Sequence, residues 1–89
     1  MAEYNSPQAI REAAAQVAEL KTKHQNGTVY HLGDPVVAAA LGVSDLHAEK
    51  NLVHIGFGDF RSEDGRWLYS WMRDTDAGRL YLCTRAGAQ

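Results

Sequence analysis

The sequence carries few side chains in patterns that could support metal binding or catalysis. Its four histidines are His24, His31, His47 and His54, and no two of them stand three or four residues apart. Zinc sites commonly use that spacing, or pairs of cysteines, because both ligands then share one helix face or one turn. The chain has a single cysteine. The sequence therefore predicts no metal site and no cofactor.

Nucleophilic catalysis is not indicated either. Cys83 falls in a predicted strand with Tyr69 as its expected neighbour, and apolar surroundings make a thiol unreactive. No serine stands in a Gly-x-Ser-x-Gly motif, and the chain has no glycine-rich phosphate loop. We therefore expect no catalytic residues and no enzymatic activity.

Residues 67–85 instead carry side chains suited to recognition. They form a predicted hairpin in which we expect Arg73 to pair with Arg79 across the turn. One face of the hairpin is then aromatic, with arginines at its ends; its facing pairs are Trp71–Tyr81, Tyr69–Cys83 and Trp67–Arg85. Tryptophan, tyrosine and arginine are enriched at the hot spots of protein interfaces. The residues predicted to bind a partner are Trp67, Tyr69, Trp71, Arg73, Arg79, Tyr81 and Arg85.

The opposite face of this hairpin is mainly aliphatic. It carries Leu68, Ser70, Met72, Leu80, Leu82 and Thr84. A strand with one solvated face alternates apolar and polar residues, whereas here both faces are apolar. Two interpretations follow: the helices of the domain cover both faces, or the aromatic face is left for a partner.

Helix signals dominate the first half of the chain. Ser6 and Pro7 form a cap followed by a proline at the first helical position, and Gly27 can end the helix that follows. Residues 28–31 are β-branched and aromatic and predict a short strand. Asp34 and Pro35 repeat the cap and the proline, and begin a second helix.

Further along, Gly42 is expected to end the second helix, and Ser44 can cap a third helix from Asp45 to about residue 50 or 52. The remaining sequence predicts a three-stranded antiparallel meander over residues 53–60, 66–73 and 79–85. We thus expect one α+β domain over residues 1–89: an N-terminal helix, a short strand, two short helices and the meander.

This order of elements resembles that of winged helix-turn-helix domains. Residues 37–44 resemble the first helix and turn of the motif, with Gly42 in the turn and Ser44 capping the recognition helix. The resemblance implies a DNA-binding transcriptional regulator, in which residues 44–51 enter the major groove and residues 62–65 form the wing. Two carboxylates and one lysine in the reading segment do not favour contacts with phosphates.

A second short resemblance lies in residues 56–60, Gly-Phe-Gly-Asp-Phe. They resemble the strand–turn signature of HU/IHF-type architectural DNA proteins, which continue into a long basic arm, but residues 61–66 contain no such arm. Gly56 and Gly58 also permit a bulge or close packing on one side of the strand.

Charge and hydropathy narrow the classes of partner. The formal net charge is −2 and the pI about 6.0, so no general attraction to nucleic acid is expected. No apolar run approaches membrane-spanning length, and the first five residues lack the pattern of a secretion signal. We therefore expect a cytoplasmic protein that does not bind membranes.

By elimination, the sequence predicts a small non-enzymatic binding protein that docks or occludes a protein partner. Small size, mild acidity and the lack of catalytic motifs are typical of inhibitor and adaptor proteins of phages and other mobile elements, including anti-CRISPR-type inhibitors. A homodimer is also compatible with so small a core. The alternative is the winged-helix DNA-binding regulator.

Overall fold

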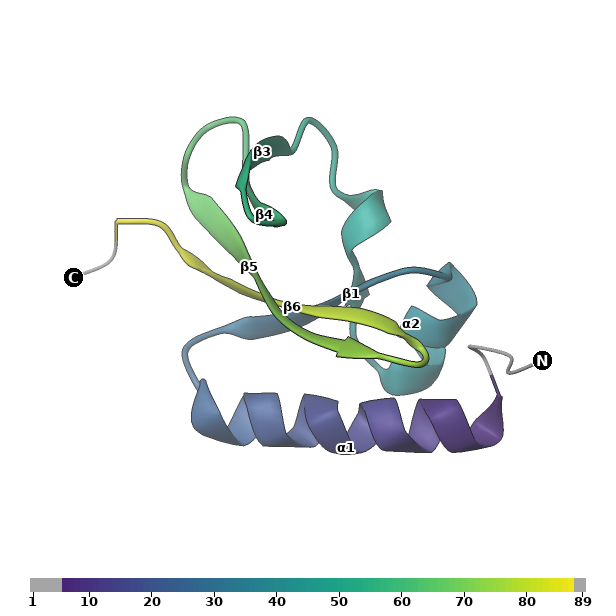
Figure 1. Ribbon diagram of the computed structural model, residues 1–89. Coiled ribbons are helices and arrows are strands. Elements are labelled where there is room, and N and C mark those ends of the chain that lie inside the picture. The colour runs from purple at the N-terminus through teal and green to yellow at the C-terminus, as the bar shows by residue number, and fades with distance from the viewer. Residues whose placement is uncertain (1–5, 88–89) are drawn as a thin grey trace.

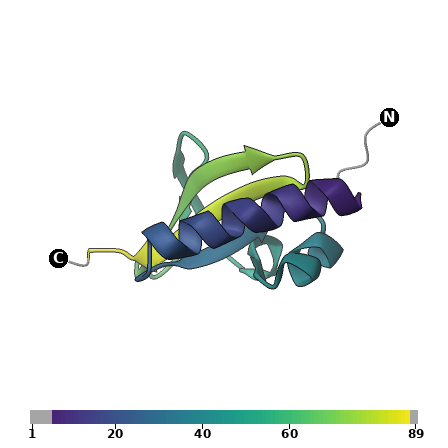
Figure 2. The ribbon, with the colours of Figure 1, turned by 90° about the horizontal axis from the view of Figure 1, so that it is seen from below.

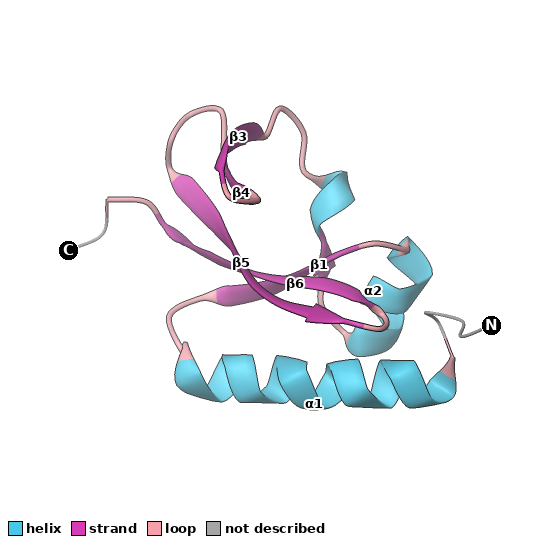
Figure 3. Cartoon of the chain, viewed as in Figure 1, coloured by secondary structure: helices cyan, strands magenta, loops and turns pink. Residues whose placement is uncertain are grey.

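The computed structural model describes residues 6–87, which form a mixed α+β fold with two α-helices and a six-stranded sheet (Figures 1 and 3). In chain order the elements are α1 (Pro7–Lys23), β1 (Thr28–Leu32), α2 (Pro35–Leu41), β2 (Ser44–Asp45), the 3-10 turn η1 (Leu46–Ala48), β3 (Val53–Gly56), β4 (Asp59–Arg61), β5 (Trp67–Thr75) and β6 (Gly78–Arg85). No helix within residues 6–87 is long and apolar enough to cross a membrane.

Both α-helices begin where the sequence predicted. The Ser6 hydroxyl accepts a hydrogen bond from the Ala9 backbone N–H at 3.2 Å, and the Asp34 carboxylate accepts one from the Val36 N–H at 2.9 Å. These bonds satisfy amide groups that have no partner inside the first helical turn. Gly42 ends α2 with a left-handed conformation, φ 71°. These predictions and that of the short strand β1 are confirmed. The expected end of the first helix at Gly27 was wrong, because α1 ends at Lys23 and the backbone N–H of His24 bonds to the Leu20 carbonyl.

The predicted third helix is wrong. Ser44 and Asp45 form β2, which pairs in parallel with β1 through Tyr30 and His31. Only the three residues of η1 turn as a helix, and they turn as a 3-10 helix. Leu46 is the buried residue of η1, and it packs against the sheet. Pairing with β1 and the burial of Leu46 thus outweigh the local helix signals.

The sheet is also larger than the predicted three-stranded meander. Its strand order is β2-β1-β6-β5-β4-β3, and every pair except β1 with β2 is antiparallel. Two features account for the correction. β1 pairs with β6 along its whole length, from Thr28 opposite Cys83 to Leu32 opposite Arg79. The strand expected over residues 53–60 is a hairpin formed by β3 and β4.

A register shift in β5 corrects the expected pairing of the last hairpin. Trp67–Arg85, Tyr69–Cys83 and Trp71–Tyr81 pair as predicted. The ladder is then irregular between Trp71 and Arg73, so that Arg73 lies opposite Leu80 and Asp74 opposite Arg79. The expected Arg73–Arg79 pair was therefore wrong. An extra residue on one strand shifts all later pairs by one position.

Different elements cover the two faces of the sheet. α1 lies along one face, as Figures 1 and 2 show, and the aliphatic cluster there consists of Val17, Leu20, Val29, Leu80 and Leu82. A second cluster joins α1 to α2 and to the β5–β6 turn and consists of Ala9, Ala13, Val37 and Ala77. On the aromatic face, Leu46 of η1 and Phe60 of β4 pack with Tyr69, Tyr81 and Cys83. The α-helices thus cover one face, and shorter segments cover part of the other.

Candidate functional site

The structure divides the predicted partner-binding residues into three groups. Tyr69 and Tyr81 are buried, with 3% and 0% of their surface exposed, and belong to the core. Trp67 and Trp71 lie on the same face of the sheet but keep 42% and 38% of their surface exposed. The tyrosines are buried and the tryptophans are exposed because η1 and β4 pack over the centre of the face and not over its ends.

The arginines are divided as well. Arg79 and Arg85 are exposed, whereas Arg73 is partly buried against α1. The bulge in β5 turns Arg73 to the helix side of the sheet, where its guanidinium donates to the Gln16 side chain and pairs with the Glu19 carboxylate. Arg73 therefore ties β5 to α1 and does not belong to the aromatic face.

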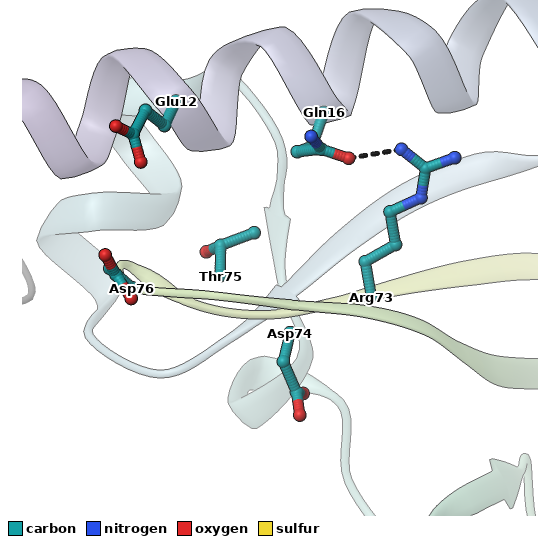
Figure 4. A pocket seen from close by; sticks show the side chains of 6 residues that line it. All are labelled: Glu12, Gln16, Arg73, Asp74, Thr75 and Asp76. Atoms are coloured by element: carbon teal, nitrogen blue, oxygen red, sulfur yellow. Dashed lines mark hydrogen bonds between the residues drawn. The ribbon is translucent and has the colours of Figure 1, made fainter.

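A polar pocket of about 480 Å³ lies beside this contact, between α1 and the β5–β6 turn (Figure 4). It is lined by Glu12, Gln16, Arg73, Asp74, Thr75 and Asp76. Arg73 and Lys23 hold the pKa of Glu19 below its ordinary value, the hydrogen bond and charge of Arg73 being the larger cause. Within residues 6–87, no group of three or more histidine, cysteine or acidic side chains could hold a metal ion.

Trp71 is the centre of a polar cluster at the other side of β5. Its indole N–H donates to the Asp74 carboxylate at 2.8 Å, and the Arg79 Nε lies 3.3 Å from the same oxygen. The Arg79 guanidinium carbon lies 4.3 Å from the centre of the Trp71 ring, within cation–π range. Asp74 therefore holds the indole and the guanidinium in one stacked arrangement.

The tip of the β3–β4 hairpin lies against this cluster. Gly58 has φ 88°, and a Cβ atom at this position would lie 2.5 Å from a ring carbon of Trp71. Close packing at Gly58 was one of the interpretations that the sequence allowed. Two hydrogen bonds fix the tip. The Tyr81 hydroxyl donates to the Gly58 carbonyl at 2.8 Å, and the backbone N–H of Trp71 donates to the Asp59 carboxylate at 2.9 Å.

Phe57, at the end of this tip, was not among the predicted site residues. It is 98% exposed, and its φ of 48° lies in the left-handed region. The Gly-Phe-Gly pattern was the available signal, because the two neighbouring glycines offer no side chain for the ring to pack against. We call Phe57, Trp71 and Arg79 the tip surface.

The remaining candidates for chemistry are buried or scattered. Cys83 is buried in the aromatic cluster, and burial raises the pKa of its thiol. His31 is also buried, and its Nε2 lies 2.6 Å from the Ala77 carbonyl oxygen. A buried thiol with a raised pKa is a poor nucleophile, because little thiolate forms at neutral pH.

Comparisons of the chain with known protein families, with curated proteins and with solved structures find no match.

Proposed function

We propose that this chain is a non-enzymatic binding protein that docks a protein partner through the tip surface. The observation that carries the proposal is Phe57, an almost fully exposed aromatic ring held at a positive φ. The two-residue turn between β3 and β4 holds both of its central residues at positive φ. A phenylalanine is strained there, and strained residues cluster at functional sites. Phe57 offers no packing within residues 6–87 that offsets this cost.

The anchoring of the tip supports the same proposal. Tyr81 and Asp59 hold the turn by hydrogen bonds, and Gly58 rests on the Trp71 ring. A ring presented on a rigid turn loses little conformational freedom on binding, so more of its contact energy becomes affinity. Phe57 and Trp71 would supply apolar area, and Arg79 would orient a partner that carries a carboxylate.

A protein partner is favoured over DNA by charge and by the form of η1. The net charge of −2 gives no electrostatic attraction to phosphates. The segment that would read DNA is a single 3-10 turn over Leu46–Ala48, which is too short to lie in the major groove as a recognition helix does. An inhibitor or adaptor role, of the kind found in phages and other mobile elements, is the form of protein binding that we propose.

The test is affinity capture with a matched pair of variants. Phe57→Asn removes the exposed ring, and Val36→Asn removes another strongly exposed apolar side chain, on α2. Immobilised parent and variants are incubated with extract of the cells that produce the protein, and bound proteins are identified by mass spectrometry. We expect a partner that is lost at least tenfold with Phe57→Asn, about 1.4 kcal/mol, and retained with Val36→Asn. Equal capture by both variants would contradict the proposal.

A further inference from the structure

A second hollow lies on the aromatic face, at the Trp67 end of β5. Its volume is about 280 Å³, close to the lower limit for sites that bind small molecules. It is lined by Thr28, Tyr30, Glu49, Trp67, Tyr69 and Cys83. None of these residues belongs to the tip surface.

The sheet register explains why the face is hollow there. Cys83 lies opposite Thr28 on one side and opposite Tyr69 on the other. Two small side chains therefore stand next to each other among large rings. Side chains two residues apart on a strand share a face, so Tyr30 and Trp67 rise beside this row and form the walls.

Two of the aromatic rings around the hollow pack edge to face. The ring centres of Tyr30 and Tyr69 are 5.3 Å apart, and the ring planes meet at 88°. Trp67 is on the same strand as Tyr69 and is 42% exposed, so its indole borders the opening. Rings from three positions thus surround one small space.

A negative charge lies at the same opening. Glu49 is exposed, and its carboxylate has no ion-pair partner among residues 6–87. Burial, and then the charge of Glu49, raises the pKa of Tyr30. The same carboxylate contributes to the raised pKa values of Tyr69 and Cys83, after the larger effect of burial. Three groups of the hollow therefore lie within the field of one unpaired carboxylate.

From this juxtaposition we propose that Tyr30, Trp67 and Tyr69, together with Glu49, form a cage for an N-methylated ammonium group. Methyl groups on nitrogen are apolar and fill a hollow between rings, while their positive charge is attracted by the ring faces and the carboxylate. An unmethylated ammonium is strongly hydrated and loses more on entering such a space. A neutral apolar group would gain nothing from Glu49.

The first experiment compares choline with 3,3-dimethyl-1-butanol, which has the same shape but carries no charge. Binding to the full chain and to its variants is measured by isothermal titration calorimetry, and in the parent also by the NMR signal of the Trp67 indole N–H. We expect saturable binding of choline and at least about tenfold weaker binding of the neutral compound. Equal affinity for the two compounds, or no binding of choline, would overturn the cage.

Variants identify the groups responsible. Trp67→Ala should weaken choline binding about tenfold or more, and Glu49→Gln about threefold to tenfold. Tyr30→Phe keeps the ring and should bind as the parent does, whereas Tyr30→Leu should not. Because Glu49 is exposed, Glu49→Gln is expected to fold even if a ring variant does not; unchanged affinity in it would contradict the proposal.

Two further experiments address the source of the cation and the independence of the hollow from the tip surface. A peptide that contains trimethyllysine replaces choline: tighter binding of the peptide indicates a methylated protein, and tighter binding of choline indicates a free or headgroup choline. Trp71→Ala alters the tip surface and should leave choline binding unchanged. Loss of choline binding in Trp71→Ala would show that the hollow is not an independent site, and would overturn the cage as drawn.

Discussion

At the scale of single residues, Phe57 has two features that do not favour the folded state. Its backbone has φ 48°, and 98% of its surface is exposed to solvent. An L-residue other than asparagine or aspartate is strained in this conformation. The ring gains no free energy from burial, since it is not buried. Replacement of Phe57 should therefore leave the fold at least as stable as it was.

We predict that Phe57→Asn raises the free energy of unfolding by about 0.5–1 kcal/mol, because asparagine tolerates the left-handed region. Chemical denaturation of the parent and the variant measures the difference. The reverse exchange is available at Asn51, which is exposed and has φ 61°. Asn51→Phe should lower the free energy of unfolding by a similar amount. A loss of stability in Phe57→Asn would mean that the ring makes a contact that stabilises the fold.

Apart from Arg73, which lies after the bulge, residue patterns predicted which side chains of the hairpin share a face, but not which of them are covered. Trp71 and Tyr81 face each other across β5 and β6 as expected, yet Tyr81 is buried and Trp71 is not. Tyr81 is covered because Phe60 and Leu46 pack in the same cluster. Those contacts join residues more than twenty positions apart, and alternation along a strand carries no information about them.

At the scale of elements, the tip of the β3–β4 hairpin packs on the Trp71 ring through Gly58. Gly58 has φ 88°, and a Cβ there would lie 2.5 Å from the Trp71 ring, whereas Gly65 has φ 76° and nothing within 4 Å of such an atom. Alanine would therefore be strained in its backbone at both positions, but only at Gly58 would it also collide with the Trp71 ring. Comparison of alanine variants at the two positions therefore separates the contact between the tip and Trp71 from the backbone strain.

We predict that Gly65→Ala lowers the free energy of unfolding by about 1 kcal/mol, from strain alone. Gly58→Ala should lower it by a further 1–3 kcal/mol or so, because the Trp71 ring or the hairpin must move. Denaturation gives the stabilities, and near-ultraviolet circular dichroism reports the indole environment. Equal losses in the two variants, with an unchanged indole signal, would show that the tip does not rest on Trp71.

Elements with local signals were predicted, and those that depend on distant contacts were not. Ser6, Asp34 and Gly42 make their hydrogen bonds or turns within a few residues, so the start of α1 and both limits of α2 follow from the sequence. The segment after Gly42 carries similar helix signals, but it pairs with β1 and forms strand β2. The bulge before Arg73 also has no local signal, and it reversed the side on which this arginine lies.

For the whole molecule, the pairing of β1 with β6 decides the architecture. It joins residues 28–32 to residues 79–83 and places the helical half of the chain against the hairpin half. The α+β class follows from composition and element order, but this pairing makes the sheet six-stranded. It also forms the floor of the aromatic hollow, since Thr28 and Cys83 meet there.

Alkaline pH should destabilise the whole fold. Burial raises the pKa of Tyr69 and of Cys83 in the folded state, so the folded chain holds these protons more tightly than the unfolded chain. The contribution of these two groups to the free energy of unfolding should be constant up to about pH 8.5 and then fall as pH rises through the ordinary pKa values of Cys and Tyr. Denaturation at several pH values tests this, and Tyr69→Phe should show a smaller decrease above pH 10 or so. An equal decrease in both proteins would show that Tyr69 does not contribute.

The most direct test of the central claim is photo-crosslinking from the tip surface. Benzoylphenylalanine replaces Phe57 in one protein and Val36 in a second, both positions being exposed, and each is irradiated in extract of the producing cells. The account predicts one adduct with a different protein from position 57, which unlabelled parent protein competes away, and no such adduct from position 36. Matching adducts from both positions, no adduct from position 57, or an adduct only with a second copy of this chain would contradict it.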